Sequence, residues 1–456
     1  MPSTFTCVVG VVAATYLFLL ALLRLTQEAK EPPSISNTIP FITPILKMVS
    51  KGLIYTLRMP GSRIYVINSA PLITSVQSQF RTLSFTTIEV NIAANVIGVT
   101  KATNDIIGRN VTSDGSYLMS FPKYVHSALS AGGVKTIKMF QWVRHELLLA
   151  STEGVYGPKN PFRDPAMEKA WYTFEPGIMM FVLKLFPPVF ARDSFKAREY
   201  MIPLKETARI EIGGSQAILS NTLPGAFWML YHIFSNPVIR EDIRNELSQG
   251  VREDDDGVCT IDLSYVKSSC PILLSTFKEM MRVNSSGSAT RIADHLLDNR
   301  YLLKKGSTIM MPTQVQHTDR SIRGDTVDEI NHRRFMREPS VKRTNPVAFR
   351  GFGGGTTLCP ERHFASTEIL IFSALMVLRF DLYPVDGKWI TPRTAKSPLV
   401  NALPVPDRDI SVEMRPKGDK LWNVSFSGHD KGMEIAAEDI EGATPFLEHR
   451  DRHKMC

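Results

Sequence analysis

Helical spacing of apolar residues dominates this chain, with one alternating stretch near its beginning. From Tyr55 to Asn68, apolar and polar residues alternate on either side of a Pro-Gly pair, which predicts a β-hairpin. Further on, the stretch at 271–282 carries helix start signals and the apolar stretch at 362–378 has few helix breakers, so we expect a helix in each. The pattern therefore predicts long helices together with a β-hairpin.

Two predicted helices begin with recognisable start signals. Asn236 precedes a proline at the head of an amphipathic stretch, as an N-cap residue before a first-turn proline does. Ser269, as N-cap, and Pro271 predict the start of the 271–282 helix in the same way. The charged run at 252–257 predicts a solvated surface loop.

The first long apolar run, Phe5 to Leu23, carries no charge and is long enough to cross a bilayer core of about 30 Å. Basic residues follow the run and none precedes it, so the positive-inside rule places the rest of the chain on the cytoplasmic side. A cleaved signal peptide is the alternative, although the run lacks a basic n-region. The sequence thus predicts a transmembrane anchor at 1–25, a stiff proline-rich hinge at 26–45, a large folded domain at 46–430 and a flexible tail at 431–456.

Composition narrows the class of protein. The 456 residues are 43% hydrophobic, which is enough for a sizeable core. Five cysteines are scattered without the paired spacing of a zinc site or a disulfide framework, which favours a reducing compartment. The net charge of +8 has no basic stripe with interleaved aromatic residues, so we expect no nucleic-acid partner. An acidic protein partner or an anionic membrane surface accounts for the charge instead.

The candidate chemistry gathers around Cys359. Three glycines, Gly353 to Gly355, precede it and would allow the backbone to approach a flat macrocycle closely. The predicted helix that begins at Arg362 would stabilise a thiolate at its N-terminus, and Phe352 would shield the sulfur from water. A tight turn with a buried free cysteine is the plainer interpretation.

This stretch resembles the haem-binding signature of the cytochrome P450 superfamily, Phe-x-x-Gly-x-x-x-Cys-x-Gly-Arg-x-x-Ala. The matching residues are Phe352, Gly353, Gly355, Cys359, Arg362, Phe364 and Ala365. The chain departs from the signature at Glu361, where the family has glycine, and at Thr357, where a cation is common. The resemblance implies a cytochrome P450 fold, which is mainly α-helical with small β-sheets. It also implies a haem b cofactor, with Cys359 as the iron ligand and Phe352, Gly353 and Gly355 beside the haem.

Further landmarks of that family follow in the same order. Glu279 and Arg282 lie three residues apart on the 271–282 helix, and Arg334 lies in a segment that resembles the family's Pro-Glu-Arg-Phe ending. Taken alone, Glu279 and Arg282 would be a solvated surface pair of little energetic value. The resemblance implies instead an ionic network of Glu279, Arg282 and Arg334 that fixes the core beneath the haem.

Other positions match less closely. Arg291 lies in a strand region where similar proteins place a cation against a haem propionate, and His317 lies in a segment that recurs there. A surface charge is the alternative for each. The family's Trp-x-x-x-Arg propionate motif is not found, and His126 or Lys123 would substitute for it.

The stretch 215–228 resembles the helix that activates oxygen in this family. Asn221 and Thr222 stand where most monooxygenases have an acid followed by threonine, and such a pair can relay protons through water. Pro224 removes one helical N–H and would free a carbonyl. The surrounding residues resemble the branch of sterol and oxysterol hydroxylases, prostacyclin synthase and fungal tailoring oxidases. An apolar core helix with incidental polar residues is the alternative.

The resemblance implies a membrane-anchored monooxygenase that oxidises an apolar small molecule, a fungal terpenoid, sterol or polyketide intermediate of secondary metabolism. Electrons would come from NADPH through NADPH-cytochrome P450 reductase, with cytochrome b5 as a second candidate donor. The protein would be a single-pass protein of the endoplasmic reticulum membrane with its catalytic body in the cytosol. Near 190–215 the helices that roof the substrate pocket look shortened by about 30 to 40 residues, roughly two long helices.

Two alternatives stay open. The first is an isomerase or dehydratase of the prostacyclin-synthase kind, which needs no reductase. The second is a catalytically degraded paralogue, for which Glu361 and the shortened roof are the reasons.

Overall fold

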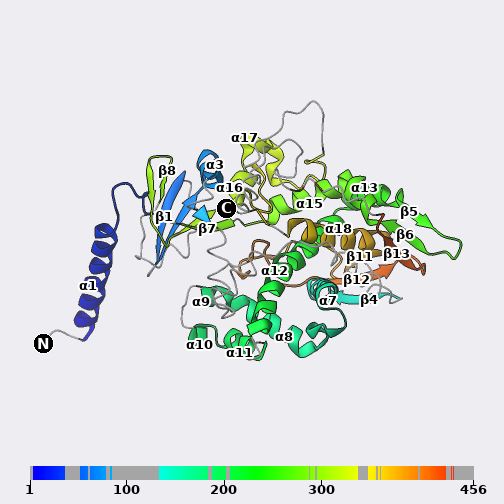
Figure 1. Cartoon of the computed structure of the whole chain (residues 1–456), viewed down its shortest axis with the longest axis horizontal. Helices are drawn as coiled ribbons and strands as arrows, with labels where there is room; N and C mark the ends of the chain where they lie inside the picture. Colours follow the sequence, from blue (N-terminus) through cyan, green and yellow to red (C-terminus); the bar gives the residue numbers. More distant parts are fainter. Residues whose placement is uncertain are drawn as a thin grey trace, which may run out of the picture. The chain divides into compact units, whose positions relative to one another are not determined.

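The computed structural model of the chain describes residues 4–35, 52–59, 62–78, 83–84, 133–182, 187–201, 206–286, 288–292, 295–336, 348–355, 358–359, 361–398, 401–427, 433 and 435. Helices make up most of this part of the chain (Figure 1). The α-helices are α1 Thr4–Leu25, α3 Ala70–Ser78, α7 Met139–Tyr156, α8 Pro165–Phe174, α9 Ile178–Val182, α10 Pro187–Phe190, α11 Arg192–Met201, α12 Glu206–Ser235, α13 Pro237–Ser248, α14 Leu263–Ser268, α15 Pro271–Asn284, α16 Thr313–His317, α17 Arg320–Arg323 and α18 Arg362–Arg379. Short 3₁₀ turns lie at η2 Gly157–Lys159, η3 Pro161–Arg163, η4 Glu175–Gly177 and η5 Asp325–Asp328.

The described strands form four small sheets. They are β1 Ile54–Met59, β2 Ser62–Ile67, β3 Leu83–Ser84, β4 Lys135–Lys138, β5 Val251–Glu253, β6 Cys259–Asp262, β7 Ser288–Ile292, β8 His295–Leu297, β9 Tyr301–Leu303, β10 Thr308–Met311, β11 Phe380–Pro384, β12 Ser411–Pro416 and β13 Trp422–Ser425. The prediction of a mainly helical fold with small sheets is therefore confirmed.

The chain divides into two compact units. The first unit comprises Met1–Ile88, Gly287–Gln316 and Asn345–Leu358. The second comprises Glu89–Ser286, His317–Thr344 and Cys359–Cys456. The division passes between Leu358 and Cys359, so the residues that precede the cysteine belong to the first unit and the cysteine itself to the second.

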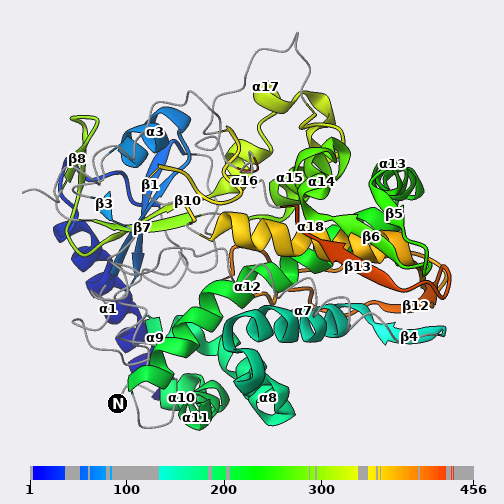
Figure 2. The same cartoon turned by 45° about the vertical axis from the view of Figure 1, so that its right-hand side comes forward.

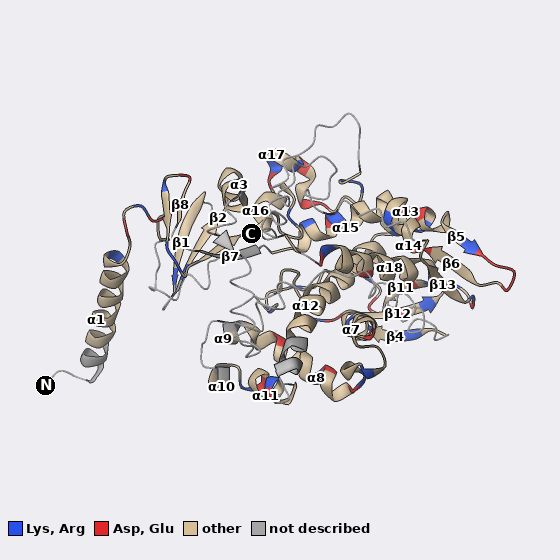
Figure 3. Cartoon of the chain, in the orientation of Figure 1, with Lys and Arg blue, Asp and Glu red and all other residues tan. Residues whose placement is uncertain are grey.

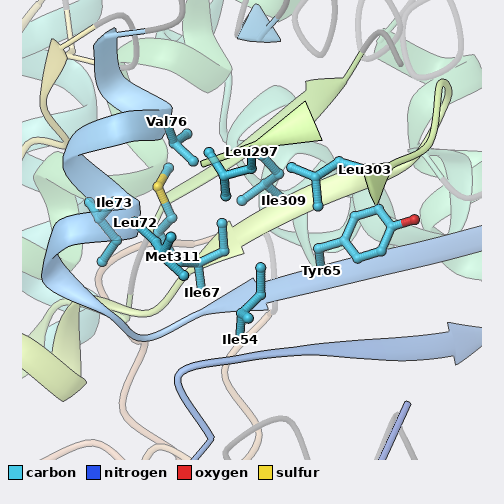
Figure 4. Packing of buried hydrophobic residues seen from close by; sticks show 10 residues of the cluster. All are labelled: Ile54, Tyr65, Ile67, Leu72, Ile73, Val76, Leu297, Leu303, Ile309 and Met311. Carbon is cyan, nitrogen blue, oxygen red and sulfur yellow. The ribbon is translucent and has the colours of Figure 1, made fainter. Parts of the chain in front are cut away.

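A five-stranded sheet, in the order β1-β2-β10-β7-β3, organises the first unit. The predicted hairpin is confirmed, because β1 pairs antiparallel with β2 from Ile54 opposite Ile67 to Met59 opposite Ser62. Figure 4 shows how side chains from β1, β2, β8, β9 and β10 pack with the apolar face of α3. Alternate residues of β1 and β2 face a second, smaller cluster, so both faces of this hairpin are covered.

Residues 26–35, the described part of the predicted hinge, lie against this sheet. Thr56 donates its N–H to Pro33 O at 2.9 Å, and Ile35 donates its N–H to Thr56 O at 3.3 Å. Glu31 lies buried beside the sheet, where it accepts a hydrogen bond from the Tyr65 hydroxyl at 3.0 Å. We call residues 26–35 the strap, because they lie along β1, the edge strand of the sheet.

The helix expected at the N-terminus is present as α1. It carries exposed apolar side chains, and its one described charge, Arg24, lies at the end that leads into the strap (Figure 3). In the part of the chain that the structure describes, no helix combines the length and the apolar character that a membrane span requires. The predicted helix is thus confirmed, whereas its predicted role as a transmembrane span is not.

The 30-residue helix α12 lies at the centre of the second unit, against α7 and α18 (Figure 2). The helices predicted at 215–228, 271–282 and 362–378 all form, within α12, α15 and α18. Asn236 caps α13 as predicted, because its side chain accepts a hydrogen bond from Val238 N at 3.0 Å. Two three-stranded sheets, β11-β12-β4 and β13-β6-β5, complete the unit.

Two local predictions in this unit were wrong. Ser269 does not cap α15, because the N-cap residue is Cys270 and its side chain makes no capping bond. The Glu246 carboxylate on α13 caps α15 instead, accepting hydrogen bonds from Ile272 N at 2.7 Å and Leu273 N at 2.9 Å. The charged run at 252–257 is not wholly a loop, since its first residues belong to β5 and pair with β6.

Candidate functional site

Cys359 lies just before the first turn of α18, as the sequence predicts. Arg362, the first residue of the helix, donates a hydrogen bond from Nη1 to Cys359 O at 3.2 Å. Ala365 N donates to Glu361 O at 3.0 Å, which closes the first helical turn. The N-terminal end of a helix carries partial positive charge, and a thiolate is stabilised there. This end of α18 therefore suits a cysteine that must stay ionised.

In the first unit, two glycines before the cysteine have conformations that favour glycine. Gly353 has a φ of +83° and Gly355 a φ of +54°, both in the left-handed region. A Cβ atom on Gly355 would also lie 2.7 Å from Gln77 Cβ and 2.9 Å from Gln77 O. Gly355 is therefore needed for contact with α3, a reason that the sequence did not reveal. Phe352 is half-buried in the same loop.

Glu361, the departure from the family signature, occupies the N-cap position of α18 without strain. Its φ of −88° and ψ of 14° are open to any residue, so the backbone does not require glycine here. Partial burial raises the pKa of the Glu361 carboxyl, which favours its neutral form. Glu361, which departs from the family signature, therefore fits the conformation at the start of α18.

In the polar turn of α12, the side chains of Ser220 and Asn221 make hydrogen bonds, whereas the Thr222 hydroxyl makes none to another described residue. Ser220 Oγ donates to Gln216 O at 2.7 Å within the helix. Asn221 Oδ1 accepts a hydrogen bond from Leu403 N at 3.0 Å, so the amide oxygen predicted to steer protons is held by a distant segment. Thr222 is only 3% exposed, and its hydroxyl makes no hydrogen bond to another described residue. Of the two residues proposed for proton delivery, Thr222 is the one whose oxygen remains available.

Pro224 lies inside α12, as predicted, and lacks the N–H that would bond the Ser220 carbonyl. That carbonyl accepts a hydrogen bond from Asn401 Nδ2 at 3.1 Å instead. Asn401 was missed by the sequence reasoning. An amide among the apolar residues that follow Pro398 indicates a polar partner, but the sequence pattern does not indicate that this partner lies on α12.

The structure brings Glu279, Arg282 and Arg334 together in one buried cluster. Arg282 donates two hydrogen bonds to Glu279, from Nε to Oε2 at 2.8 Å and from Nη2 to Oε1 at 2.9 Å. Arg334 Nε donates to Glu279 Oε1 at 3.1 Å, and Asn331 N donates to the same oxygen at 3.0 Å. Glu279 is fully buried and Arg282 is 1% exposed, so the alternative of a solvated surface pair does not hold.

His317 extends this cluster and is not a surface residue. It is fully buried, and its backbone oxygen accepts a hydrogen bond from Arg282 Nη1 at 3.0 Å. Its Nδ1 lies 3.0 Å from Arg282 O, and since a carbonyl can only accept, Nδ1 carries the proton in this contact. The histidine therefore packs as part of the structural core around α15.

The remaining predicted residues are less well defined. Arg291 lies on β7 in the first unit, opposite Thr308 of β10 and Ser84 of β3. His126, Lys123 and Thr357 lie outside the described residues. The shortened region near 190–215 contains α10, α11 and the start of α12 in its described parts.

A cavity of about 170 Å³ lies between α7, α8 and α12, and Glu175 of η4 lines it. Burial raises the pKa of the Glu175 carboxyl to about 7, while a hydrogen bond from Asn401 and the charge of Arg144 act in the opposite direction. None of the residues predicted to contact the haem lines this cavity. Within the described residues, no group of three or more His, Cys, Asp and Glu side chains could hold a metal ion.

Comparisons with known proteins agree with one another. The family model described as Cytochrome P450 matches residues 215–410. The chain is 31% identical to cytochrome P450 monooxygenase nodJ of Hypoxylon pulicicidum over 490 aligned positions, which cover 90% of this chain and 95% of that protein. It is 27% identical to cytochrome P450 7A1 of Rattus norvegicus over 230 positions, or 46% of each chain. Because 490 positions exceed the 456 residues of this chain, the Hypoxylon protein carries segments that this chain lacks.

Among solved structures, the retinoic acid-bound cyanobacterial CYP120A1 matches with a TM-score of 0.64. The match covers 85% of this chain and 99% of that chain at 15% identity. At this identity, the likeness concerns the fold.

Proposed function

Because the chain belongs to the cytochrome P450 family, we propose that it oxidises an apolar small molecule, a sterol, terpenoid or polyketide intermediate of fungal secondary metabolism. The enzyme is a monooxygenase, and its cofactor is haem bound through an axial thiolate. In this family, electrons come from NADPH through a reductase. The substrate class is inferred from the names of the fungal and sterol-oxidising relatives.

The single observation that carries the proposal is the position of Cys359 at the start of α18. Its thiolate would hold the haem iron, and the bound haem would supply the activation of molecular oxygen. The backbone conformations of Gly353 and Gly355 favour glycine, so the loop before Cys359 carries no side chain at these two positions. These features fit a haem that requires close backbone approach on the cysteine side. Phe352 and Arg291 are proposed as further haem contacts.

Thr222 is proposed to move protons within the site. Its hydroxyl is buried in α12 and not bonded to another described residue, so it can donate to a bound water and accept from another. Asn221 is proposed to act indirectly, because its oxygen accepts from Leu403 N and so holds this turn in place.

The test is the absorbance spectrum of the reduced, carbon-monoxide-bound protein. We expect a thiolate-type Soret band in the native protein and its loss in Cys359→Ala. Cys259→Ala is the matched control, since Cys259 is another cysteine of the second unit that is not in a disulfide, but it lies on β6, away from the start of α18. A thiolate-type band that survives in Cys359→Ala would rule out this cysteine as the ligand.

Two alternatives are separated by simple measurements. Turnover that needs no NADPH would favour an isomerase or dehydratase over a monooxygenase. A degraded paralogue would bind little haem, and Glu361→Gly would then raise its haem content. We expect equal haem content in the two proteins, because the conformation of Glu361 does not require glycine.

We also propose that α1 attaches the catalytic body to the endoplasmic reticulum membrane, with the body in the cytosol. The support is the exposure of large apolar side chains along this helix, among them Val11, Leu17 and Phe18. A reductase of the same membrane would then be the electron donor, with cytochrome b5 as a second donor. Cell fractionation of the full chain and of a version without residues 1–25 tests this, and equal membrane association of both would contradict it.

A further inference from the structure

Asn401 donates to α12 the hydrogen bond that Pro224 cannot make. A helical carbonyl normally accepts from the N–H four residues later, and for Ser220 that residue is Pro224. Asn401 Nδ2 lies 3.1 Å from Ser220 O and donates to it. The helix continues through the proline from Glu206 to Ser235, so the missing bond is replaced without a break.

Two nearby acceptors favour this orientation of the amide, which leaves Asn401 Oδ1 without a hydrogen-bond partner among the described residues. Asn401 Nδ2 also donates to Glu175 Oε1 at 3.3 Å, so its two hydrogens have two acceptors. Turning the amide around would place Oδ1 against the Ser220 carbonyl, where two acceptors would repel. Asn401 is 4% exposed, which excludes water as an easy substitute.

Two further hydrogen bonds join the same segment to the same stretch of α12. Leu403 N donates to Asn221 Oδ1 at 3.0 Å, and Trp228 Nε1 donates to Pro404 O at 2.7 Å. Gly225 allows the close approach, because a Cβ atom there would lie 3.1 Å from Leu403 Cδ1. We call residues 401–404 the brace, since they contact α12 on either side of the proline.

The brace also contacts Ser286, which lies just beyond the C-terminal end of α15. Ser286 N donates to Ala402 O at 2.8 Å, and the Ser286 hydroxyl donates to the same oxygen at 3.1 Å. The brace is thus bonded to the segment that directly follows α15, the helix that carries Glu279 and Arg282. The brace can therefore hold the turn of α12 that it contacts in a fixed position.

We propose that Asn401 is a positioning residue, which replaces the helical donor that Pro224 lacks and thereby holds the turn that carries Thr222. The contact itself depends only on the geometry, whereas its effect on catalysis rests on the proposed function of Thr222. The two parts can fail separately, so the experiment measures each.

The first measurement is amide hydrogen exchange of α12 peptides in the haem-loaded enzyme, for Asn401→Leu in two backgrounds. In the native background we expect exchange within residues 216–228 to rise about five- to tenfold, as the loss of one buried hydrogen bond predicts. Pro224→Ala restores the N–H that bonds Ser220 O, so in that background Asn401→Leu should change exchange by less than about twofold.

Asn423→Leu serves as the control, because Asn423 is exposed on β13 and should leave α12 unchanged. If Asn401→Leu does not fold, Asn401→Asp answers the same question, since it keeps the size but offers an oxygen in place of the donor. Equal acceleration in both backgrounds, or none in either, would overturn the contact as the replacement for the missing helical bond.

The second measurement is the peroxide released per NADPH consumed, with reductase present and no substrate added. We expect Asn401→Leu to raise this ratio about twofold or more, in the same direction as Thr222→Ala, and Pro224→Ala to suppress the increase. Faster exchange with an unchanged ratio would make Asn401 merely structural and overturn its positioning role. An unchanged ratio in Thr222→Ala itself would overturn the proposed function of that threonine, while the exchange data would still judge the brace.

Discussion

The cluster around Glu279 and the turn around Pro224 solve the same problem, the burial of polar groups, in opposite ways. Glu279 accepts four hydrogen bonds, three of them from guanidinium groups of Arg282 and Arg334. The turn at Pro224 has no charged donor, and a neutral amide satisfies its freed carbonyl. Charge-assisted bonds are about twice as strong as neutral ones, so the first region is held more strongly than the second.

The difference indicates different tasks. A redundant buried network tolerates little movement, because each displaced charge would lose several partners at once. The neutral hydrogen bonds that hold the turn at Pro224 contribute about 1 kcal/mol each, so this turn can be shifted at a lower cost. We infer that the first region fixes the frame of the second unit, while the second region holds the turn that carries Thr222, the residue proposed to move protons.

The largest expected effect comes from removing the charge of the network. Glu279→Gln leaves the buried guanidinium of Arg282 and the partly buried one of Arg334 without their carboxylate, which should lower the free energy of unfolding by about 3 to 5 kcal/mol. Urea denaturation of the purified protein, followed by intrinsic fluorescence, measures this.

Asp242→Asn is the matched control, because Asp242 also pairs with an arginine, Arg333 at 2.8 Å, but at a partly exposed site. We expect a loss of at most about 1 kcal/mol there. Losses of equal size in both variants would remove the contrast between a buried frame and an ordinary surface pair.

A smaller effect should appear in the pH dependence, because Glu175 is the titratable partner of Asn401 in the brace. Its pKa is raised by burial from 4.5 to about 7, so the folded state binds a proton more tightly than the unfolded state. The free energy of unfolding should therefore fall as pH rises from about 4.5 to about 7, by roughly 2 to 3 kcal/mol.

Glu175→Gln should abolish that part of the pH dependence, and the informative quantity is the difference between the two proteins at each pH. The subtraction removes groups that act in the opposite direction, such as His232, whose pKa is lowered to about 4 by burial. A difference that does not vary with pH would show that Glu175 titrates normally.

The smallest effect is expected at Asn221. Asn221→Leu removes the acceptor of the Leu403 N–H and should lower the free energy of unfolding by about 1 kcal/mol. Asn221→Asp keeps an oxygen at the same position and should cost less than half as much. A larger loss in Asn221→Asp than in Asn221→Leu would mean that the side chain does not act as the acceptor.

Local patterns in the sequence predicted the helices that carry these two regions, but not the contacts between residues that lie far apart in the sequence. The helix at 271–282 follows from apolar spacing, and the approach of Glu279 to Arg282 follows from their separation of three residues. Arg334 could be added through the family resemblance, because its position 52 residues after Arg282 leaves no periodic signal.

The contact between the brace and α12 could not be predicted from local sequence patterns. The freed carbonyl at Ser220 follows directly from Pro224, since proline has no N–H. Its partner lies 181 residues away in the sequence, and only the packing of α12 against the segment after Pro398 selects Asn401 from the other amides. The same holds for the capping of α15 by Glu246, where a tertiary contact replaced the expected local cap at Ser269.

A shortened protein intended for solution work should begin at Thr26 and not beyond the strap. Residues 26–35 cover the outer edge of β1, and Thr56 exchanges backbone hydrogen bonds with Pro33 and Ile35 there. A chain cut after Ile35 would leave that edge unpaired and open to strand addition by a second molecule. The yield of monomeric material should therefore drop when the cut moves from Leu25 to Ile35, even though both versions have lost α1.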